Sequence, residues 1–189
     1  SLYGALGNRY FRFFDQRIAE AITLTGQLTI RWAEYALNTY LNRVLKQTER
    51  KDYIVAIDTD SLYVCLDDIV SKFNPENPID FLDKVANDML EPELAKSYDS
   101  LFKILGGVSN RMVMKREAIA DRAIWTAKKR YILNVHDNEG VRYKKPKLKI
   151  MGIEAIKSST PEPCREALKA LFKVIIQKDE RETQLAIEK

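Results

Sequence analysis

The stretch YIVAIDTDSLYVCLDD, from Tyr53 to Asp68, places two aspartates between two runs of strand-forming residues. The residues before Asp58 are β-branched, aromatic or small and apolar, and the residues from Leu62 onward continue in the same character. Such a pattern predicts a β-hairpin with Asp58 and Asp60 at its tip. Because two carboxylates separated by a single residue repel each other, such a pair is useful where a cation lies beside it.

The two acids suit a hard divalent cation. Side chains two residues apart in an extended strand point to one face, and at a hairpin tip Asp58 and Asp60 can converge on one ion. Mg²⁺ binds oxygen ligands and commonly takes one or two protein carboxylates together with substrate phosphates. Two such ions about 3.5–4 Å apart form an arrangement used for phosphoryl transfer. The D-x-D pattern also fits an acidic turn that keeps a hairpin soluble, or a sugar-nucleotide transferase, although no Gly-rich loop for a nucleotide accompanies it.

The remaining elements follow from periodicity and from turn residues. Apolar residues at helical spacing predict a long amphipathic helix over residues 17–46, with Trp32 and Tyr35 as core anchors. A second helix is expected over residues 79–105, with a kink or a new start at Pro92. Further along the chain we expect strands over residues 112–119, 123–135 and 141–150, a turn over 136–140, and a helix over 168–176. The fold class is therefore α+β, with an antiparallel sheet and an acidic hairpin packed on long helices.

Charge is distributed unevenly along the chain. Residues 47–110 hold 13 acidic and 6 basic side chains, a net charge of −7, whereas residues 111–150 hold 12 basic and 4 acidic side chains, a net charge of +8. The basic segment contains Trp125, Tyr131 and Tyr143, and a basic segment with interleaved aromatic rings is a candidate nucleic-acid surface. A solvated face of the sheet explains the same charges.

The composition narrows the class of protein. The chain has 189 residues, of which 46% are apolar and 31% charged, and this suits one domain, or one and a fraction, with a hydrophobic core. It contains no run of apolar residues long enough to predict a membrane span and no basic-then-apolar signal segment. Its two cysteines, Cys65 on a strand predicted to be buried and Cys164, lie far apart, which favours a reducing, intracellular compartment. The single His136 has no metal-ligand companions in its motif and is interpreted as a surface residue.

Four motifs, in order, make the sequence similar to a known family. SLYGALGN at residues 1–8, IDTDSLYV at 57–64, KKRY at 128–131 and LKIMGIEAIKSSTP at 148–161 resemble motifs of the family B (alpha-type) DNA polymerases, in particular the replicative polymerases of large tailed bacteriophages. The resemblance covers essentially the whole chain. It implies the end of the fingers over residues 1–12, the C-terminal half of the palm over 13–150, and the start of the thumb, with its first helix, over 151–189. Because the chain begins without Met and inside the first motif, we interpret it as a piece of a longer protein.

The resemblance assigns the two acids to a metal site. Asp60 would be the principal ligand of two Mg²⁺ ions in the complete enzyme, and Asp58 would tune the site or help to bind the ions. Tyr3 and Gly4 would border the nascent base pair, where an aromatic ring and a missing side chain respond to the shape of the minor groove. The alternative interpretation of this pair is a Tyr that packs a helix end beside a Gly cap.

The resemblance also implies a binding surface for the primer strand. Lys129 and Tyr131 would lie along the primer end, with Lys128 and Arg130 on the other face of the same strand, and Lys149 could touch the primer backbone. Lysines that neutralise phosphates give an affinity that is independent of base sequence and falls with added salt. Without the family, a solvated basic strand is the simpler interpretation.

Glu117 occupies a position where the family has a palm carboxylate, and it is a further candidate for the site. The family's second essential metal ligand, the lysine that meets the incoming triphosphate and the proofreading exonuclease all lie before the first residue here. We therefore expect a parent polymerase that adds dNTPs to the 3′ end of a primer on template DNA in the host cytoplasm, and an isolated chain that is inactive without the N-terminal part. A natural subunit of a split polymerase and a non-catalytic DNA-binding module are the alternatives. A sheet edge left exposed without the absent part would favour self-association.

Overall fold

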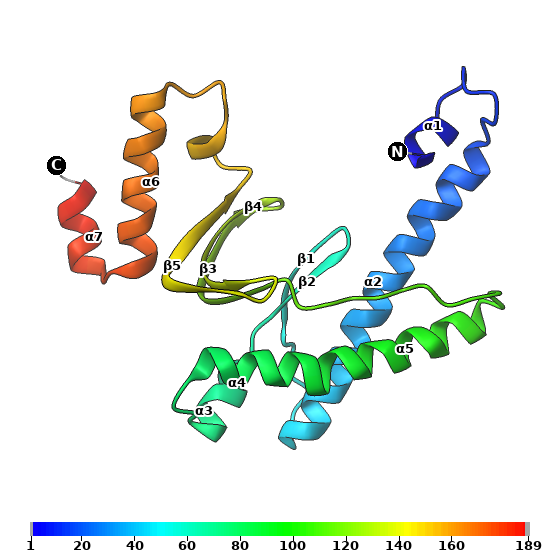
Figure 1. Ribbon diagram of the computed structural model, residues 1–189, viewed down its shortest axis with the longest axis horizontal. Helices are drawn as coiled ribbons and strands as arrows, with labels where there is room; N and C mark the ends of the chain where they lie inside the picture. The colour runs from blue at the N-terminus through cyan, green and yellow to red at the C-terminus, as the bar shows by residue number, and fades with distance from the viewer. Residues whose placement is uncertain (1, 188–189) are drawn as a thin grey trace. The chain divides into compact units, whose positions relative to one another are not determined.

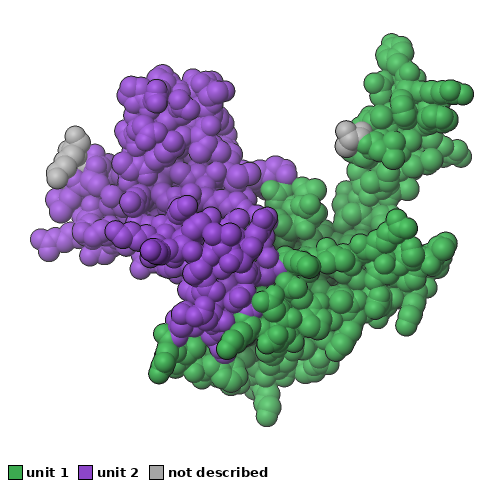
Figure 2. Space-filling model, in the orientation of Figure 1, with its two compact units in different colours: residues 1–76, 84–115 green, residues 77–83, 116–189 purple. Residues whose placement is uncertain are grey.

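The chain folds into two compact units. The computed structural model describes residues 2–187, and Figure 2 colours the two units separately. The first unit comprises the described residues as far as Glu76 together with Lys84–Lys115, and the second comprises Asn77–Asp83 together with the described residues from Arg116 onward. The acidic hairpin therefore belongs to the first unit and the basic strands belong to the second.

The long helix α2 (Gln16–Leu45) confirms the helix predicted over residues 17–46. It begins at the N-cap Asp15, whose carboxylate accepts a backbone N–H of the first turn at 2.9 Å. It ends at Lys46, which adopts a left-handed backbone conformation and donates its N–H back to the last turn. A short helix, α1 (Leu2–Leu6), precedes α2.

One face of α2 packs against α5 (Glu91–Ile104) and forms the core of the first unit. Leu37 and Leu41 are almost fully buried. Trp32 is half-buried, and its indole N–H donates to the carbonyl of Ser97 at 3.0 Å, so its predicted role as a core anchor is confirmed. Tyr35 is 59% exposed, and its predicted anchor role is wrong because the covered stripe of the helix lies on a neighbouring face.

The predicted acidic hairpin is confirmed. β1 (Ile54–Asp58) pairs antiparallel with β2 (Ser61–Val64), and Figure 1 shows the resulting ribbon. The hairpin is fixed to α2 by the buried Asn38, whose side-chain oxygen accepts the backbone N–H of Tyr53 at 2.8 Å. Cys65 follows β2 and is half-buried rather than inside a buried strand; it and the exposed Cys164 are free thiols.

The helix predicted over residues 79–105 is divided into three parts. α4 (Pro78–Val85) is followed by a π-helical turn (Ala86–Leu90) and then by α5. Pro92, in the first turn of α5, has no N–H to donate to the preceding turn, and a π-type turn is one adjustment to such an interruption. The short helix α3 (Asp67–Phe73) connects the hairpin to this segment along the chain.

The second unit contains a three-stranded antiparallel sheet in the order β3-β4-β5. Its strands are β3 (Ala118–Ala127), β4 (Arg130–Asn138) and β5 (Val141–Met151), so the return strand predicted over residues 141–150 is confirmed. The strand predicted over residues 112–119 is wrong except at its last two residues, because the chain before Ala118 is irregular.

Two further predictions about this sheet are right in kind but wrong in their bounds. The strand expected over residues 123–135 is broken by a turn at Lys128 and Lys129, where Lys129 has a φ of 60°. The turn expected over residues 136–140 is confined to Glu139 and Gly140, whose φ values of 51° and 84° resemble those of a primed hairpin turn. His136 consequently lies inside β4, with a side chain that is 25% exposed.

A helix packs on the sheet of the second unit. β5 leads through a 3₁₀ turn (Glu154–Ile156) into α6 (Glu162–Gln177) and α7 (Glu180–Ile187), so the helix predicted over residues 168–176 is confirmed. Figure 1 shows α6 beside the strands. The core between them is formed by Ile132, Ile153 and Ile176, with Leu148, Ile150 and Phe172 packed around it.

Candidate functional site

The two candidate metal ligands lie at the tip of the β1–β2 hairpin. Asp58 is the last residue of β1 and is paired with Ser61, so Thr59 and Asp60 form a two-residue turn. The N–H of Asp60 donates to the carbonyl of Asp58 at 2.7 Å, and the hydroxyl of Ser61 donates to the same carbonyl at 3.0 Å. Because Asp60 is in the turn, the alternation of a strand does not set the direction of its side chain.

The turn holds an unusual backbone conformation. Thr59 has a φ of 53°, in the left-handed region that a β-branched residue rarely adopts. A residue in such a region costs about 1–3 kcal/mol, and residues of this kind cluster at functional sites. The Thr59 hydroxyl lies 3.1 Å from Oδ1 of Asp58, which gives the side chain a contact with one of the two acids. The strained turn is an observation independent of the motif, and it supports a functional role for the hairpin tip.

The hairpin offers part of a metal site. Asp58 is half-buried and Asp60 is exposed, so their oxygens, which are the hard donors that Mg²⁺ prefers, are accessible at one tip. Across residues 2–187, no group of three or more His, Cys, Asp or Glu side chains is arranged to hold a metal ion. The donor chemistry fits Mg²⁺, and the other ligands would come from water, from substrate phosphates or from another polypeptide segment.

The KKRY motif lies in the second unit, at the turn between β3 and β4. Lys128 and Lys129 occupy the turn and are exposed, and the turn is closed by a hydrogen bond of 3.3 Å from the hydroxyl of Thr126 to the carbonyl of Arg130. The predicted alternation of these side chains along one strand is wrong, because β4 begins only at Arg130. Two lysines therefore project from a tight turn rather than from a flat strand surface.

The other two residues of the motif are held by neighbours. Tyr131 is 6% exposed, and its ring lies 6.4 Å from that of Trp125 at an interplanar angle of 42°. Arg130 is exposed and lies 3.5 Å from a carboxylate oxygen of Glu154, just beyond β5. Tyr131 consequently belongs to the packing beneath the turn, whereas the lysines form its accessible edge.

The structure brings Lys149 and Glu117 together. Lys149 in β5 and Glu117, directly before β3, form a hydrogen-bonded ion pair with both side chains partly exposed. The two residues lie 32 positions apart in the sequence, and β4 lies between β3 and β5 in the sheet, so the contact is made by the two long side chains rather than by neighbouring strands. A DNA phosphate approaching Lys149 would therefore compete with the Glu117 carboxylate.

The two candidates for the nascent base pair lie in α1. Tyr3 is 47% exposed, and its carbonyl accepts the N–H of Gly7 at 3.2 Å. Gly4 follows in the same helical turn and is exposed. Their arrangement matches a helix end as well as it matches a surface for a base pair.

Sequence reasoning missed a network of ion pairs in the second unit. Asp137 in β4 is 1% exposed and accepts hydrogen bonds from the side chains of Arg116 and Arg142. Arg116 also binds Asp83 at 2.5 Å, and Arg142 also binds Asp80 at 2.7 Å. The network ties the first turns of α4 to the β3–β5 sheet. The local sequence carried no signal for this network, because Asp137 lies in the polar stretch HDNEG, which was expected to be an exposed turn.

The pKa of Asp137 reflects this surrounding. Burial alone would raise the pKa of its carboxyl, because desolvation disfavours the charged form. The hydrogen bond from Arg116, the backbone N–H of Gly140 and the nearby charges outweigh burial and hold the pKa below its ordinary value of 3.8. Asp137 is therefore charged in the folded chain at neutral pH, and the network serves structure rather than proton transfer.

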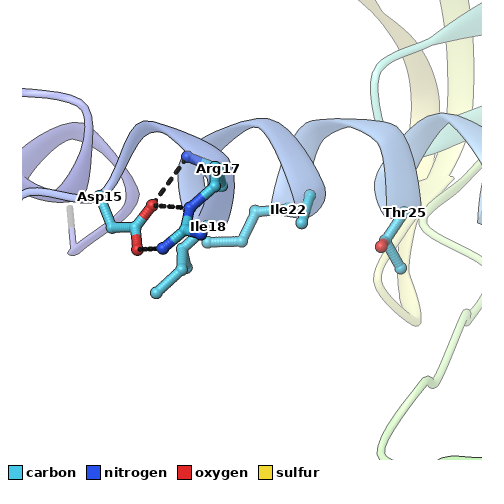
Figure 3. A pocket seen from close by; sticks show the side chains of 6 residues that line it. Asp15, Arg17, Ile18, Ile22 and Thr25 are labelled. Atoms are coloured by element: carbon cyan, nitrogen blue, oxygen red, sulfur yellow. Dashed lines mark hydrogen bonds and ion pairs between the residues drawn. The ribbon is translucent and has the colours of Figure 1, made fainter.

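A hollow of about 730 Å³ lies on the surface of the first unit, along the first turns of α2. Figure 3 shows its lining, in which Arg17 pairs with Asp15 at 3.0 Å beside Ile18, Ile22 and Thr25. All of its lining residues come from α2 and the cap before it, and none of the candidate site residues is among them. The hollow is an open stretch of helix surface. Separately, none of the helices within residues 2–187 combines the length and the hydropathy needed to span a membrane.

Two curated bacteriophage proteins are similar to nearly the whole chain. The chain is 44% identical over 194 aligned positions to the DNA-directed DNA polymerase of Escherichia phage RB69, and the match covers 95% of this chain and 21% of that protein. It is 41% identical over 198 aligned positions to the DNA-directed DNA polymerase of Enterobacteria phage T4, with 97% and 22% covered. No protein-family model matches the chain.

These findings place the chain among sequences similar to one part of phage nucleic-acid polymerases. More specifically, the chain is a relative of one part of the phage DNA-directed DNA polymerases, so the resemblance predicted from its motifs is confirmed. The chain spans about a fifth of the length of the relatives it matches.

Proposed function

We propose that the chain supplies part of the catalytic centre and of the primer-binding surface of a template-directed family B DNA polymerase. The observation that carries the proposal is the similarity to two DNA-directed DNA polymerases over 95% and 97% of the chain. The strained turn at Thr59, next to the two acids of the metal motif, supports it independently. In this assignment residues 1–12 belong to the fingers, 13–150 to the palm and 151–189 to the thumb.

The acidic tip would hold the metal. Asp60, exposed in the turn, is the principal ligand, and Asp58, whose side chain also contacts the Thr59 hydroxyl, helps to bind the ions. When bound, Mg²⁺ would lower the pKa of the attacking 3′ hydroxyl of the primer and stabilise negative charge on the phosphates of the dNTP. The hairpin is anchored at its start, because the buried Asn38 of α2 accepts the backbone N–H of Tyr53. The chain itself contributes two carboxylate side chains, Asp58 and Asp60, on an anchored hairpin.

The basic turn would hold the primer. Lys128 and Lys129 project from the β3–β4 turn and would neutralise backbone phosphates, with Arg130 beside them. Lys149 would add a contact once Glu117 releases it. Tyr3 and Gly4 would face the nascent base pair.

We further propose that the chain alone does not catalyse primer extension. Two carboxylates are too few ligands to hold two Mg²⁺ ions at low concentration, and the remaining ligands belong to the part of the polymerase that the similarity does not cover. The test is primer extension by the purified chain with Mg²⁺ or Mn²⁺. Robust nucleotide incorporation by the chain alone would overturn this part of the proposal.

Two alternatives give different results in DNA and metal binding. A non-catalytic DNA-binding module is favoured by the placement of two exposed lysines on one tight turn, and its binding to DNA would be unchanged by Asp60→Asn and by chelators. A natural subunit of a split polymerase would regain extension activity on mixing with a partner that carries the other metal ligand. For the proposed polymerase site, Mn²⁺ binding followed by calorimetry should weaken in Asp60→Asn and persist in Asp88→Asn, an exposed aspartate of the same unit.

A further inference from the structure

Gly152 lies against the backbone of the lysine turn. It is the residue after β5, and its φ of +67° falls in the left-handed region. A Cβ added at this position would lie 2.1 Å from the carbonyl oxygen of Lys129 and 3.1 Å from the carbonyl carbon. Ordinary contacts of a Cβ begin at 3.4 Å, and here the obstacle is backbone rather than the end of a flexible side chain. Any side chain at position 152 must therefore displace the turn or the segment after β5 by roughly 1 Å.

The segment on the Gly152 side cannot easily retreat. The residue before it, Met151, is paired with Tyr131 at the start of β4. The residue after it, Ile153, is 7% exposed and belongs to the core formed with Ile132 and Ile176. Gly152 is therefore flanked by Met151, which is paired in the sheet, and by Ile153, which is buried in the core. An added side chain would consequently displace the Lys128–Lys129 turn.

The turn is tied to the same segment a second time. Arg130, which follows the two lysines, lies 3.5 Å from Glu154, two residues beyond Gly152. Within the turn, the Thr126 hydroxyl donates to the carbonyl of Arg130, and Lys129 has a φ of 60°. Two sequence motifs that lie apart in the chain are therefore in backbone contact.

We propose that Gly152 is a positioning residue that sets where Lys128 and Lys129 meet the phosphates of a DNA primer. The proposal rests on the proposed function, in which these lysines bind the primer backbone. Gly152 touches no DNA in this account, and it acts through the Lys129 carbonyl. Because Gly152 has no Cβ, the segment after β5 can lie directly against the backbone of the turn. This contact restricts the turn, and with it the positions of Lys128 and Lys129.

Gly140→Ala is a matched control for Gly152→Ala. Both glycines have a positive φ in turns or strand ends of the same sheet, but a Cβ at Gly140 would meet nothing within 4 Å. Both substitutions therefore carry the backbone penalty of an L residue, and only Gly152→Ala adds the collision with Lys129.

The first measurement is made without DNA. In the folded chain, Gly152→Ala should shift the backbone amide resonances of residues 128–130 and speed their hydrogen exchange, while Gly140→Ala should leave these amides unchanged. Ile153→Val loosens the anchor by one methyl group and keeps the fold, and it should speed exchange at residues 128–130 by about two- to tenfold. Unchanged amides of the turn in Ile153→Val and in a folded Gly152→Ala would overturn the proposal.

The second measurement is the salt dependence of binding to a fluorescent primer–template duplex. Lys129→Ala should reduce the slope of log Kobs against log salt by about 0.9, the value for one lost phosphate contact. Gly152→Ala should reduce it by about 1 to 2, because both lysines move, and Gly140→Ala should not change it. If Lys129→Ala lowers the slope and Gly152→Ala does not, the positioning role is refuted and the primer site stands. If neither changes the slope, the primer site itself fails, and the positioning role fails with it.

Discussion

Replacing Asp137 with Asn removes the negative charge at the centre of the network that joins Asn77–Asp83 to the β3–β5 sheet. Asp137 is 1% exposed and accepts hydrogen bonds from Arg116, from Arg142 and from the N–H of Gly140. Breaking a buried ion pair by removing one partner typically costs about 3–5 kcal/mol of unfolding free energy.

We expect a loss of about 3 kcal/mol, at the lower end of that range, because both arginines keep a second carboxylate. Arg116 retains Asp83 at 2.5 Å and Arg142 retains Asp80 at 2.7 Å, so neither guanidinium is left buried without a counter-ion. The amide oxygen of the introduced Asn can still accept the N–H of Gly140.

The assay is urea unfolding at pH 7, followed by far-UV circular dichroism, with the midpoint and the slope fitted separately. Asp80→Asn is the matched control, because Asp80 belongs to the same network but its side chain is 58% exposed, and it should lose less than about 1 kcal/mol. The reasoning is refuted if Asp137→Asn costs less than about 1 kcal/mol, or no more than the control does.

Three other predictions concern pH, backbone strain and association. The pKa of Asp137 is lower in the folded chain than its ordinary value of 3.8, so its contribution to the unfolding free energy is full above that value and is lost as pH falls below it. Acid titration of stability should therefore show a smaller decline in Asp137→Asn than in the unchanged chain. Thr59→Gly should raise the unfolding free energy by up to about 1 kcal/mol by relieving the φ of 53°, while weakening Mn²⁺ binding at the loosened tip. The outer strands β3 and β5 and the exposed Ile18 and Ile22 of α2 should promote self-association, measured as a concentration-dependent mass in light scattering; a constant monomer mass at high concentration would contradict this.

Local patterns predicted the parts of the fold that depend on local physics. The acidic hairpin followed from strand-forming residues on both sides of Asp58 and Asp60, and the paired strands place the acids at its tip. The helical spacing of apolar residues predicted α2, but it did not show which face of α2 another helix would cover. Tyr35 is exposed because the partner helix α5 covers the stripe that contains Leu37 and Leu41.

The errors in the second unit come from pairing between distant residues. The turn at Lys128 and Lys129 contains no Gly, Pro, Asn or Asp, and it forms because β3 and β4 pair around it and hold Lys129 at a positive φ. The ion pair of Glu117 with Lys149 likewise joins residues 32 positions apart in the sequence, and no local pattern indicates it. Gly152 carried no local turn signal that would connect it to the lysines, because its constraint is a contact with the backbone of Lys129.

The central claim is that Asp60 is a metal ligand of a DNA polymerase, and it is tested most directly by primer extension. The chain would replace the homologous segment of the RB69 polymerase, with which it is 44% identical. Extension by this chimera should fall at least about 100-fold in Asp60→Asn, more than the loss typical for partners one step removed from a metal, and should be unchanged in Asp88→Asn. Equal extension by the two variants would contradict the assignment of the acidic tip to the catalytic centre.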